Sequence, residues 1–330
     1  MITVGCKPIT DVSMRSDNPM PTSENDSTDN IDESEDYEQE HFDLENSNCD
    51  NFSALLGMPS FSSRGTINAP YGAVYNLSEN IFLYGKNIDE RIFPGGASNL
   101  LTALVAYEAL NPDFIFTVGD EIDVILDSTS IAGLRKGQEL GLEAILTALF
   151  LTVGDDAAYT ISVNTARFKS ESENASNNEM NDYFIRLMSD YAHRLGFQGS
   201  NFTNPCGSHE SNNYSTVRDL TILAAAATRN SLITEICGKH EHQVTFASGE
   251  VASWQNYNPY LNLGNWDIRG FRAGYTRESG FSTQILAYID NKIYIIVVSG
   301  SDTAESRERD VVSLLLLARM GYEEDFVWAF

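Results

Sequence analysis

The chain has 330 residues, with 47 Asp and Glu against 21 Lys and Arg, and a net charge of −26 at pH 7. This charge argues against nucleic acid and anionic membranes as direct partners of the folded part, because both carry negative charge themselves. Hydrophobic residues make up 42% of the chain, enough to form a sizeable core.

The first 50 residues hold 14 Asp and Glu against Lys7 and Arg15. Because they also contain few aliphatic residues, we expect a disordered acidic tail over residues 1–58, followed by one folded domain over residues 59–330. Residues 2–6 resemble the end of a bacterial lipoprotein signal, which makes Cys6 a candidate lipidation site if the true start lies upstream. The alternative is an ordinary cytosolic N-terminus. Membrane contact is expected only through such an anchor.

Hydrophobic patterning predicts strands near both ends of the domain and helices between them. Such an order favours an α+β domain with an antiparallel sheet. Ser98 is expected to cap the first helix. In chain order the predicted elements are a hairpin at 73–84, a helix from 97 to about 110, a strand at 122–126, helices at 140–151, 181–195 and 215–228, strands at 270–275, 282–290 and 292–299, and a helix at 311–320.

Residues 94–104 resemble the loop and helix start at which a serine acyl-transferase carries the sequence S-x-x-K. A serine hydroxyl is a weak nucleophile until a neighbouring base takes its proton, and residues three apart share one helix face. In the register that best fits the following residues, Gly96 stands at the Ser position and Asn99 at the Lys position. Neither residue can perform the chemistry of the motif.

Several further segments match those of one known family in their order along the chain. Each match alone is weak, but together they indicate a resemblance. The chain resembles the D-alanyl-D-alanine carboxypeptidases, which are low-molecular-mass penicillin-binding proteins of the serine β-lactamase fold, peptidase family S11. The resemblance covers roughly residues 60–330. The segments that carry it are 94–104, 130–137, 154–158, 195–197, 201–207, 213–219, 270–276 and 279–280.

The chemistry that this resemblance implies depends on three motifs, S-x-x-K, S-x-N and K-T-G. All three are altered here. Besides Gly96 and Asn99, the chain has Val153-Gly154-Asp155 in place of S-x-N and Arg272-Ala273-Gly274 in place of K-T-G. The resemblance implies that Arg272 and Gly274 could still hold the carboxylate end of a substrate, while the covalent route through serine is lost.

Two residues are candidate substitute catalysts. Ser98 would require a shifted register, which places Leu101 at the Lys position and turns the hydroxyl away from the cleft by about 200°. Asp155 could activate water only if burial raised its pKa. An Asp155–Arg272 ion pair that fills an inactive pocket is the simpler interpretation.

We therefore expect an inactive carboxypeptidase-like domain outside the cytoplasm that retains binding of the peptidoglycan stem peptide. One alternative is a structural interaction module with a closed pocket and a protein partner. Another is a working hydrolase that uses Ser98 or Asp155. No metal motif is evident around His240 and His242, and neither a cofactor nor a metal is expected. Cys206 and Cys237 are expected to be separate buried thiols, with a disulfide as the alternative.

Overall fold

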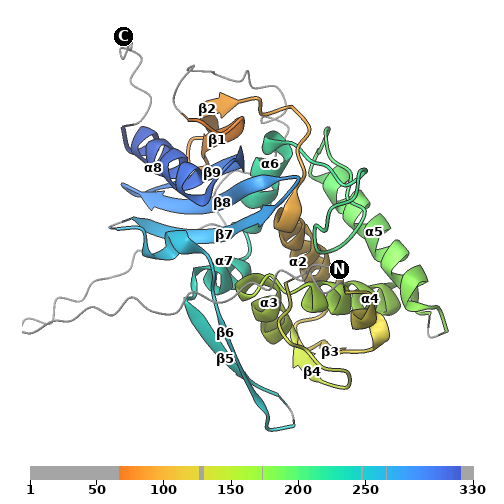
Figure 1. The fold of residues 1–330 in the computed structure, drawn as a ribbon. Helices are drawn as coiled ribbons and strands as arrows, with labels where there is room; N and C mark the ends of the chain where they lie inside the picture. Colours follow the sequence, from red (N-terminus) through yellow and green to blue (C-terminus); the bar gives the residue numbers. More distant parts are fainter. Residues whose placement is uncertain (1–66, 126–129, 173, 247, 265, 321–330) are drawn as a thin grey trace, which may run out of the picture. The chain divides into compact units, whose positions relative to one another are not determined.

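A five-stranded antiparallel sheet is the centre of the computed structural model, which describes residues 67–125, 130–172, 174–246, 248–264 and 266–320. The strand order is β2-β1-β9-β8-β7, so strands from both ends of the domain lie side by side (Figure 1). This arrangement confirms the predicted α+β class. The strands are β1 Tyr71–Asn76, β2 Ile81–Lys86, β7 Asp267–Thr276, β8 Gly280–Ile289 and β9 Lys292–Ser301.

The sheet has a hydrophobic core on each face. Side chains of β9 alternate between them, because successive residues of a strand point to opposite faces. Tyr294 and Ile296 pack into the core beneath helix α8, Ala304–Met320. Ile293 and Ile295 pack into the larger core shared with the other helices. In Figure 1, α8 covers one face of the sheet and α6 the other.

The remaining helices form a second layer around α2, Ser98–Ala109, whose first nine residues are all buried. A helix that is apolar on all sides is a buried one, as the sequence predicted. The others are α3 Leu142–Leu151, α4 Asp155–Ser170, α5 Asn177–Arg194, α6 Val217–Ala227 and α7 Ser231–Gly238. Three short 3₁₀-helices are η2 Gly95–Ala97, η3 Asp120–Val124 and η4 Pro259–Asn262.

Two small two-stranded antiparallel sheets lie beside the helices (Figure 1). One pairs β3 Ile115–Thr117 with β4 Glu139–Gly141, and the other pairs β5 Glu241–Thr245 with β6 Val251–Gln255. In the main sheet, the turn between β8 and β9 has φ of 50° at Asp290 and 60° at Asn291. Two left-handed residues suit the type I′ turn that matches strand twist, so the predicted junction at this dipeptide is confirmed.

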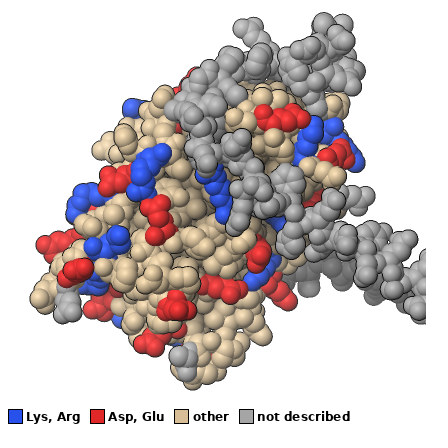
Figure 2. Space-filling view, turned by 180° about the vertical axis from the view of Figure 1, so that it is seen from behind, with Lys and Arg blue, Asp and Glu red and all other residues tan. Residues whose placement is uncertain are grey.

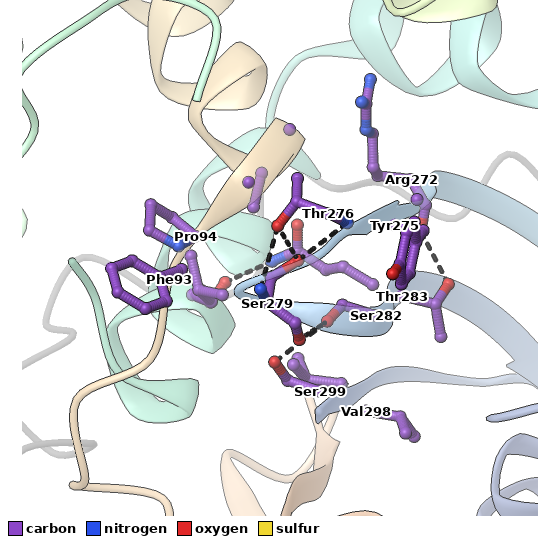
Figure 3. Close-up of a pocket in the computed structure, with 17 residues that line it drawn as sticks. Phe93, Pro94, Arg272, Tyr275, Thr276, Ser279, Ser282, Thr283, Val298 and Ser299 are labelled. Carbon is purple, nitrogen blue, oxygen red and sulfur yellow. Dashed lines mark hydrogen bonds between the residues drawn. The ribbon is translucent and has the colours of Figure 1, made fainter. Parts of the chain in front are cut away.

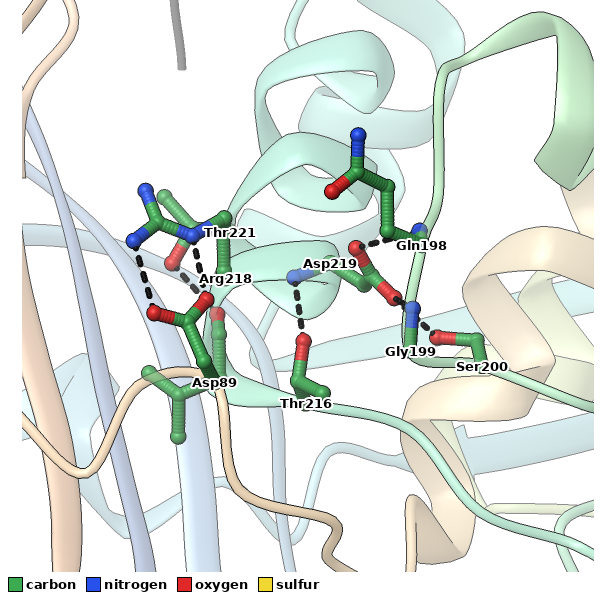
Figure 4. A network of polar contacts seen from close by, with 9 residues as sticks. Asp89, Gln198, Gly199, Ser200, Thr216, Arg218, Asp219 and Thr221 are labelled. Carbon is green, nitrogen blue, oxygen red and sulfur yellow. Dashed lines mark hydrogen bonds and ion pairs between the residues drawn. The ribbon is translucent and has the colours of Figure 1, made fainter. Parts of the chain in front are cut away.

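A buried polar network fixes the start of α6 to the preceding loop (Figure 4). The Asp219 carboxylate accepts hydrogen bonds from the backbone of Gly199 at 2.9 Å and from the Ser200 hydroxyl at 2.6 Å. The Thr216 side chain caps the helix by accepting from the Asp219 backbone at 3.0 Å. These bonds satisfy donors that the helix and loop would otherwise leave unpaired.

Three predictions about local structure are wrong or incomplete. The expected strand at 122–126 is instead the 3₁₀-helix η3, as far as its residues are described. Here the Glu121 carboxylate accepts from the Gly119 backbone at 2.8 Å, a local bond that competes with strand pairing. Ser98 is not an N-cap: it has helical φ of −58°, because η2 runs directly into α2. The sequence analysis also did not predict α4, α7 or the β5–β6 hairpin.

Among the described residues, no helix combines the length and apolarity needed to cross a bilayer. On the face seen in Figure 2, Lys and Arg side chains lie among Asp and Glu side chains. The predictions for the tail at 1–58 and for Cys6 lie outside the described residues.

Candidate functional site

Gly96, at the Ser position of the first altered motif, lies in a tight turn between β2 and α2. Gly95 has φ of 51° and Gly207 has φ of 83°, conformations that favour glycine. A Cβ added to Gly207 would overlap the carbonyl of Gly95, so the two segments meet backbone to backbone. The Thr102 hydroxyl fixes this contact by donating to the Pro205 carbonyl at 2.6 Å.

The guanidinium of Arg272 fills the space in front of Gly96. A Cβ built on Gly96 would overlap the Cζ, Nε and Nη2 atoms of Arg272. On the other side, a Cβ on Gly274 would lie 3.8 Å from Nε and Nη2. The Arg272 side chain therefore lies between the glycine of the first altered motif and the glycine of the third. It occupies the volume into which a serine at position 96 would project.

Asn99 holds one corner of this guanidinium. When the Asn99 amide oxygen faces Arg272, it accepts from Nη1 at 3.3 Å, and the amide nitrogen donates to the Cys206 carbonyl at 3.1 Å. In the opposite orientation the amide nitrogen of Asn99, a donor, would face the donor Nη1 of Arg272, and the amide oxygen would face the Cys206 carbonyl. Nε of Arg272 is buried and has no hydrogen-bond partner in the described part of the chain. Asn99 stands where the family pattern has a base. Its side chain is uncharged and connects Arg272 on β7 to the backbone of Cys206.

Burial lowers the pKa of Arg272 to about 10, and the negative charge of Asp155 partly opposes this shift. The guanidinium therefore remains protonated at neutral pH. The negative charge of Asp155 favours the protonated form of Arg272, so the two charges attract each other.

The segment at the altered S-x-N motif is fixed by the start of α4. Asp155 is 7% exposed, and its backbone donates to the Ser130 carbonyl at 2.8 Å. The Asp156 carboxylate accepts from the backbone of Ala132 at 2.8 Å and of Leu134 at 2.9 Å. Val153, where a serine is expected, has φ of 64°, a left-handed conformation in which a β-branched residue is strained.

A cavity of about 60 Å³ adjoins Gly96 and Arg272. Figure 3 shows hydroxyl groups gathered along the β7–β8 turn, opposite Phe93 and Pro94. The hydroxyl of Thr276 donates to that of Ser279 at 2.7 Å. The lining residues are Phe93, Pro94, Gly95, Gly96, Ala97, Leu220, Arg272, Gly274, Tyr275, Thr276, Ser279, Ser282, Thr283, Gln284, Val297, Val298 and Ser299.

Two buried thiols lie near this region, and they are not joined. Cys206 and Cys237 are free, which confirms the expectation of separate thiols. Burial raises the pKa of Cys206 to about 12, with a further contribution from the charge of Asp155, and burial also raises that of Cys237. Neither is therefore a thiolate nucleophile at neutral pH.

The structure brings together Gly96, Asn99, Arg272 and Gly274 of the predicted site. It does not bring Ser98 into the cavity, because this residue is 0% exposed and is absent from the lining. Ala273 packs instead against the core on the α8 side of the sheet.

Sequence reasoning missed Arg307, a buried cation on α8. Its Nη1 donates to the carbonyls of Gly274 and Ser282, each at 3.3 Å, and its Nε donates to the Tyr260 hydroxyl at 2.9 Å. A charged residue within a helix that packs against a sheet was the available signal. No cluster of three or more metal-ligating side chains occurs in the described ranges, His240 and His242 included.

Comparisons with known proteins point to one family. The model of the D-alanyl-D-alanine carboxypeptidase family, Peptidase S11, matches residues 62–303. A D-alanyl-D-alanine carboxypeptidase of Bacillus subtilis is 28% identical over 245 residues, which cover 73% of this chain and 59% of that protein. One from a Streptomyces species is 27% identical over 262 residues, which cover 77% of this chain and 88% of that protein.

Solved structures show the same likeness. The Streptomyces K15 DD-transpeptidase is 25% identical with a TM-score of 0.69, over 79% of this chain and 98% of that one. Penicillin binding protein 6B of Escherichia coli shares the fold, with a TM-score of 0.67. The chain spans about three-fifths of the length of the Bacillus relative. On the family match and the order of its three altered motifs, this chain belongs to the D-alanyl-D-alanine carboxypeptidase family, Peptidase S11.

Proposed function

We propose that this chain is a catalytically inactive member of its family that acts outside the cytoplasm in cell-wall metabolism. The observation that carries the proposal is the position of the Arg272 guanidinium, which fills the space in front of Gly96. A serine at position 96 and this arginine conformation exclude each other. The two substitutions therefore form one compatible arrangement rather than two independent losses.

The chemistry of the cleft supports inactivity. General acid–base catalysis contributes about 10²–10⁴-fold, but in this mechanism it acts on a nucleophile, and position 96 has no side chain. Ser98 is fully buried and its hydroxyl has no hydrogen-bond partner among the described residues. A serine without a neighbouring base is not activated. The alternative of a working hydrolase through Ser98 or Asp155 thus lacks a supporting contact.

The ligand implied by the relatives is the stem peptide of peptidoglycan, since their names specify D-alanyl-D-alanine as the group on which they act. Arg272 and Gly274 still border the cavity at the strand that would lie beside such a peptide. A planar guanidinium suits a carboxylate because it offers two parallel donors. We propose that recognition of the carboxylate end has outlasted the covalent chemistry.

A second candidate function is an interaction module whose pocket is closed and whose partner is a protein. The small cavity volume of about 60 Å³ favours it, because ligand pockets usually measure about 300–1,000 Å³. The bond between Asn99 and Arg272 favours it too, since it holds the guanidinium in place. One binding experiment can therefore distinguish the two candidate functions.

A calorimetric titration with a soluble stem peptide ending in D-Ala-D-Ala separates them. The peptide-binding function predicts saturable heat that Arg272→Ala abolishes, and no release of free D-alanine during the same incubation. Absence of heat at millimolar peptide would favour the interaction module. Release of D-alanine that Ser98→Ala or Asp155→Asn removes would refute inactivity itself.

A further inference from the structure

We infer that a second pocket, where the ends of β1, β8 and β9 meet the segment after β2, binds one neutral polyhydroxylated ring of the size of a pyranose sugar. The pocket measures about 440 Å³. It shares Phe93, Tyr275, Ser279 and Ser299 with the cavity beside Gly96, and Figure 3 shows these four residues around the β7–β8 turn. The inference goes beyond the proposed function and does not depend on it, because it concerns other residues and another class of ligand.

Four exposed charged side chains line this pocket, and their charges cancel. Arg91 and Arg277 are positive, whereas Glu278 and Asp302 are negative. None of the four forms an ion pair or a side-chain hydrogen bond among the described residues. The Cζ atom of Arg91 lies 4.0 Å from the centroid of the Tyr214 ring, a contact that holds this side chain without using its N–H groups. The pocket therefore offers charged hydrogen-bonding groups without favouring an ion of either sign.

The lining needs a ligand that both donates and accepts hydrogen bonds. Guanidinium groups only donate, carboxylates only accept, and hydroxyl groups do both. Ser301 also lines the pocket and is 2% exposed, and its buried hydroxyl has no partner in the described part of the chain. A buried hydroxyl is usually paired. The hydroxyl groups of a sugar can serve all three kinds of group, whereas a simple anion would pair with the arginines and be repelled by the carboxylates.

An exposed aromatic ring forms part of the same lining. Tyr275 is 58% exposed, and its ring centroid lies 4.4 Å from that of Phe281 at an interplanar angle of 34°. The Cζ atom of Arg307 lies 5.8 Å from the Phe281 centroid. This stack holds the Tyr275 ring in position before a ligand arrives. The C–H groups on one face of a pyranose ring are apolar and slightly positive, so they can pack on an aromatic face, which is slightly negative.

The turn that presents Arg277 and Glu278 is fixed by reciprocal hydrogen bonds. The Ser279 backbone donates to the Thr276 hydroxyl oxygen at 2.9 Å, and the Thr276 backbone donates to the Ser279 hydroxyl oxygen at 3.3 Å. Binding groups that are held in place before the ligand arrives lose less conformational freedom on binding. The two charged side chains at the tip of the turn therefore extend from a fixed backbone.

The volume matches one ring rather than a chain of several. A pocket of about 440 Å³ corresponds to about 15 water molecules at ~30 Å³ each, and it lies in the range of about 300–1,000 Å³ that is usual for small-molecule sites. A hexose with one substituent has a similar number of non-hydrogen atoms. Because a ligand of this size makes few contacts, we expect a dissociation constant of about 1 mM.

The test is a titration of the full chain with N-acetylglucosamine and with glucose, followed by ¹H–¹⁵N NMR, and a parallel titration with sodium phosphate. We expect saturable shifts at the amides of Arg277, Glu278 and Ser301 with either sugar. Tyr275→Ala should weaken sugar binding by about tenfold or more, because it removes the aromatic surface. Glu278→Ala should weaken it by about fivefold, because it removes a charged acceptor.

Tyr257→Ala is the matched control for the aromatic ring, since Tyr257 is 73% exposed and lies outside this pocket. Arg309→Ala is the control for charge, because Arg309 is exposed on α8 and is also absent from the lining. Both should leave the sugar affinity unchanged. If Tyr275→Ala does not fold, Arg277→Ala at the exposed tip of the turn takes its place and should also weaken binding by about fivefold.

Absence of saturation by both sugars at tens of millimolar would overturn the inference, as would sugar binding that is unchanged in Tyr275→Ala and Glu278→Ala. Saturable shifts with phosphate and none with sugar would overturn it too, because they would indicate an anion site. The proposed function is measured separately, by stem-peptide binding and by the absence of an acyl adduct. A chain that binds sugar and also forms an adduct would refute the proposed function alone.

Discussion

The guanidinium of Arg272 lies where a Cβ on residue 96 would lie, so any side chain at position 96 requires Arg272 to move. In the sequence they are 176 positions apart and belong to different motifs. In the structure they form one contact at the junction of β7 and η2. The first and the third altered motif therefore meet in one contact.

The mutual exclusion of the two side chains predicts a coupling energy. Gly96→Ser should destabilise the protein by about 1–3 kcal/mol, because it overpacks a filled site. In an Arg272→Ala background, Gly96→Ser should lower the free energy of unfolding much less. A double-mutant cycle measured by urea unfolding should therefore give a coupling energy of at least about 1 kcal/mol. Ala97→Ser on the next residue is a matched control that should show no coupling. Additive effects of Gly96→Ser and Arg272→Ala would contradict the contact.

The left-handed backbone at Val153 predicts that a better residue for this conformation will stabilise the fold. Asparagine visits this region readily, whereas a β-branched residue does so at a cost of about 1–2 kcal/mol. Val153→Asn should therefore raise the free energy of unfolding by about 1 kcal/mol. Val153→Ala keeps a Cβ and should gain less. A loss of stability in Val153→Asn would indicate that packing of the valine outweighs the strain.

The raised thiol pKa values predict protection from alkylation. At neutral pH, Cys206 and Cys237 should react with iodoacetamide far more slowly in the native protein than in urea, because only the thiolate reacts and both groups are buried. Peptide mapping by mass spectrometry resolves the two positions. Equal labelling rates in the native and unfolded protein at Cys206 would show that the loop around it opens freely.

The pair of Asp89 and Arg218 predicts a dependence on pH. Their two hydrogen bonds measure 2.5 Å and 2.9 Å, and the bond to Arg218 lowers the pKa of Asp89 (Figure 4). A lowered pKa stabilises the fold above the unfolded value of about 3.9, and this contribution disappears as the pH falls through the folded value. Because Asp89 is largely exposed, we expect Asp89→Asn to cost about 1 kcal/mol at neutral pH.

That difference between wild type and Asp89→Asn should vanish in acid below the pKa of the folded carboxyl. Chemical unfolding at several pH values measures it. Asp113→Asn is the control, an acidic residue in an exposed turn with no ion pair among the described residues. A cost that stays constant across the acidic range would show that the carboxylate charge is not its origin.

Much of the fold was predictable because its elements have strong local signals. The long strands and the buried α2 carry hydrophobic patterns of clear period, and Asp290-Asn291 has the residues that a type I′ turn requires. The start of α4 was not predicted because its sequence is polar. Its residues are buried through tertiary contacts, since Asp156 accepts hydrogen bonds from backbone groups more than 20 residues earlier in the chain. The acidic run in η3 was misassigned for a related reason, since local side-chain bonds decide its conformation.

The altered motifs were visible in the sequence, while their geometry was not. The sequence suggested an attraction between Arg272 and Asp155, and the structure adds that the guanidinium lies against Gly96 with its Nη1 on Asn99. The contacts of this guanidinium depend on the rotamer that the arginine side chain adopts among its neighbours. A sequence motif does not specify this rotamer. Arg307 was overlooked because its role is to bond backbone carbonyls of β7 and β8.

The most direct test of the central claim, that the filled site at Gly96 closes covalent chemistry, is the intact mass of the protein after incubation with benzylpenicillin. The account predicts an unchanged mass at all times, both for the wild type and for Ser98→Ala. A stoichiometric mass increase equal to one penicillin, mapped to a serine and lost on its replacement by alanine, would contradict it. In that case the chain would be a working acyl-transferase whose nucleophile lies outside the altered motif.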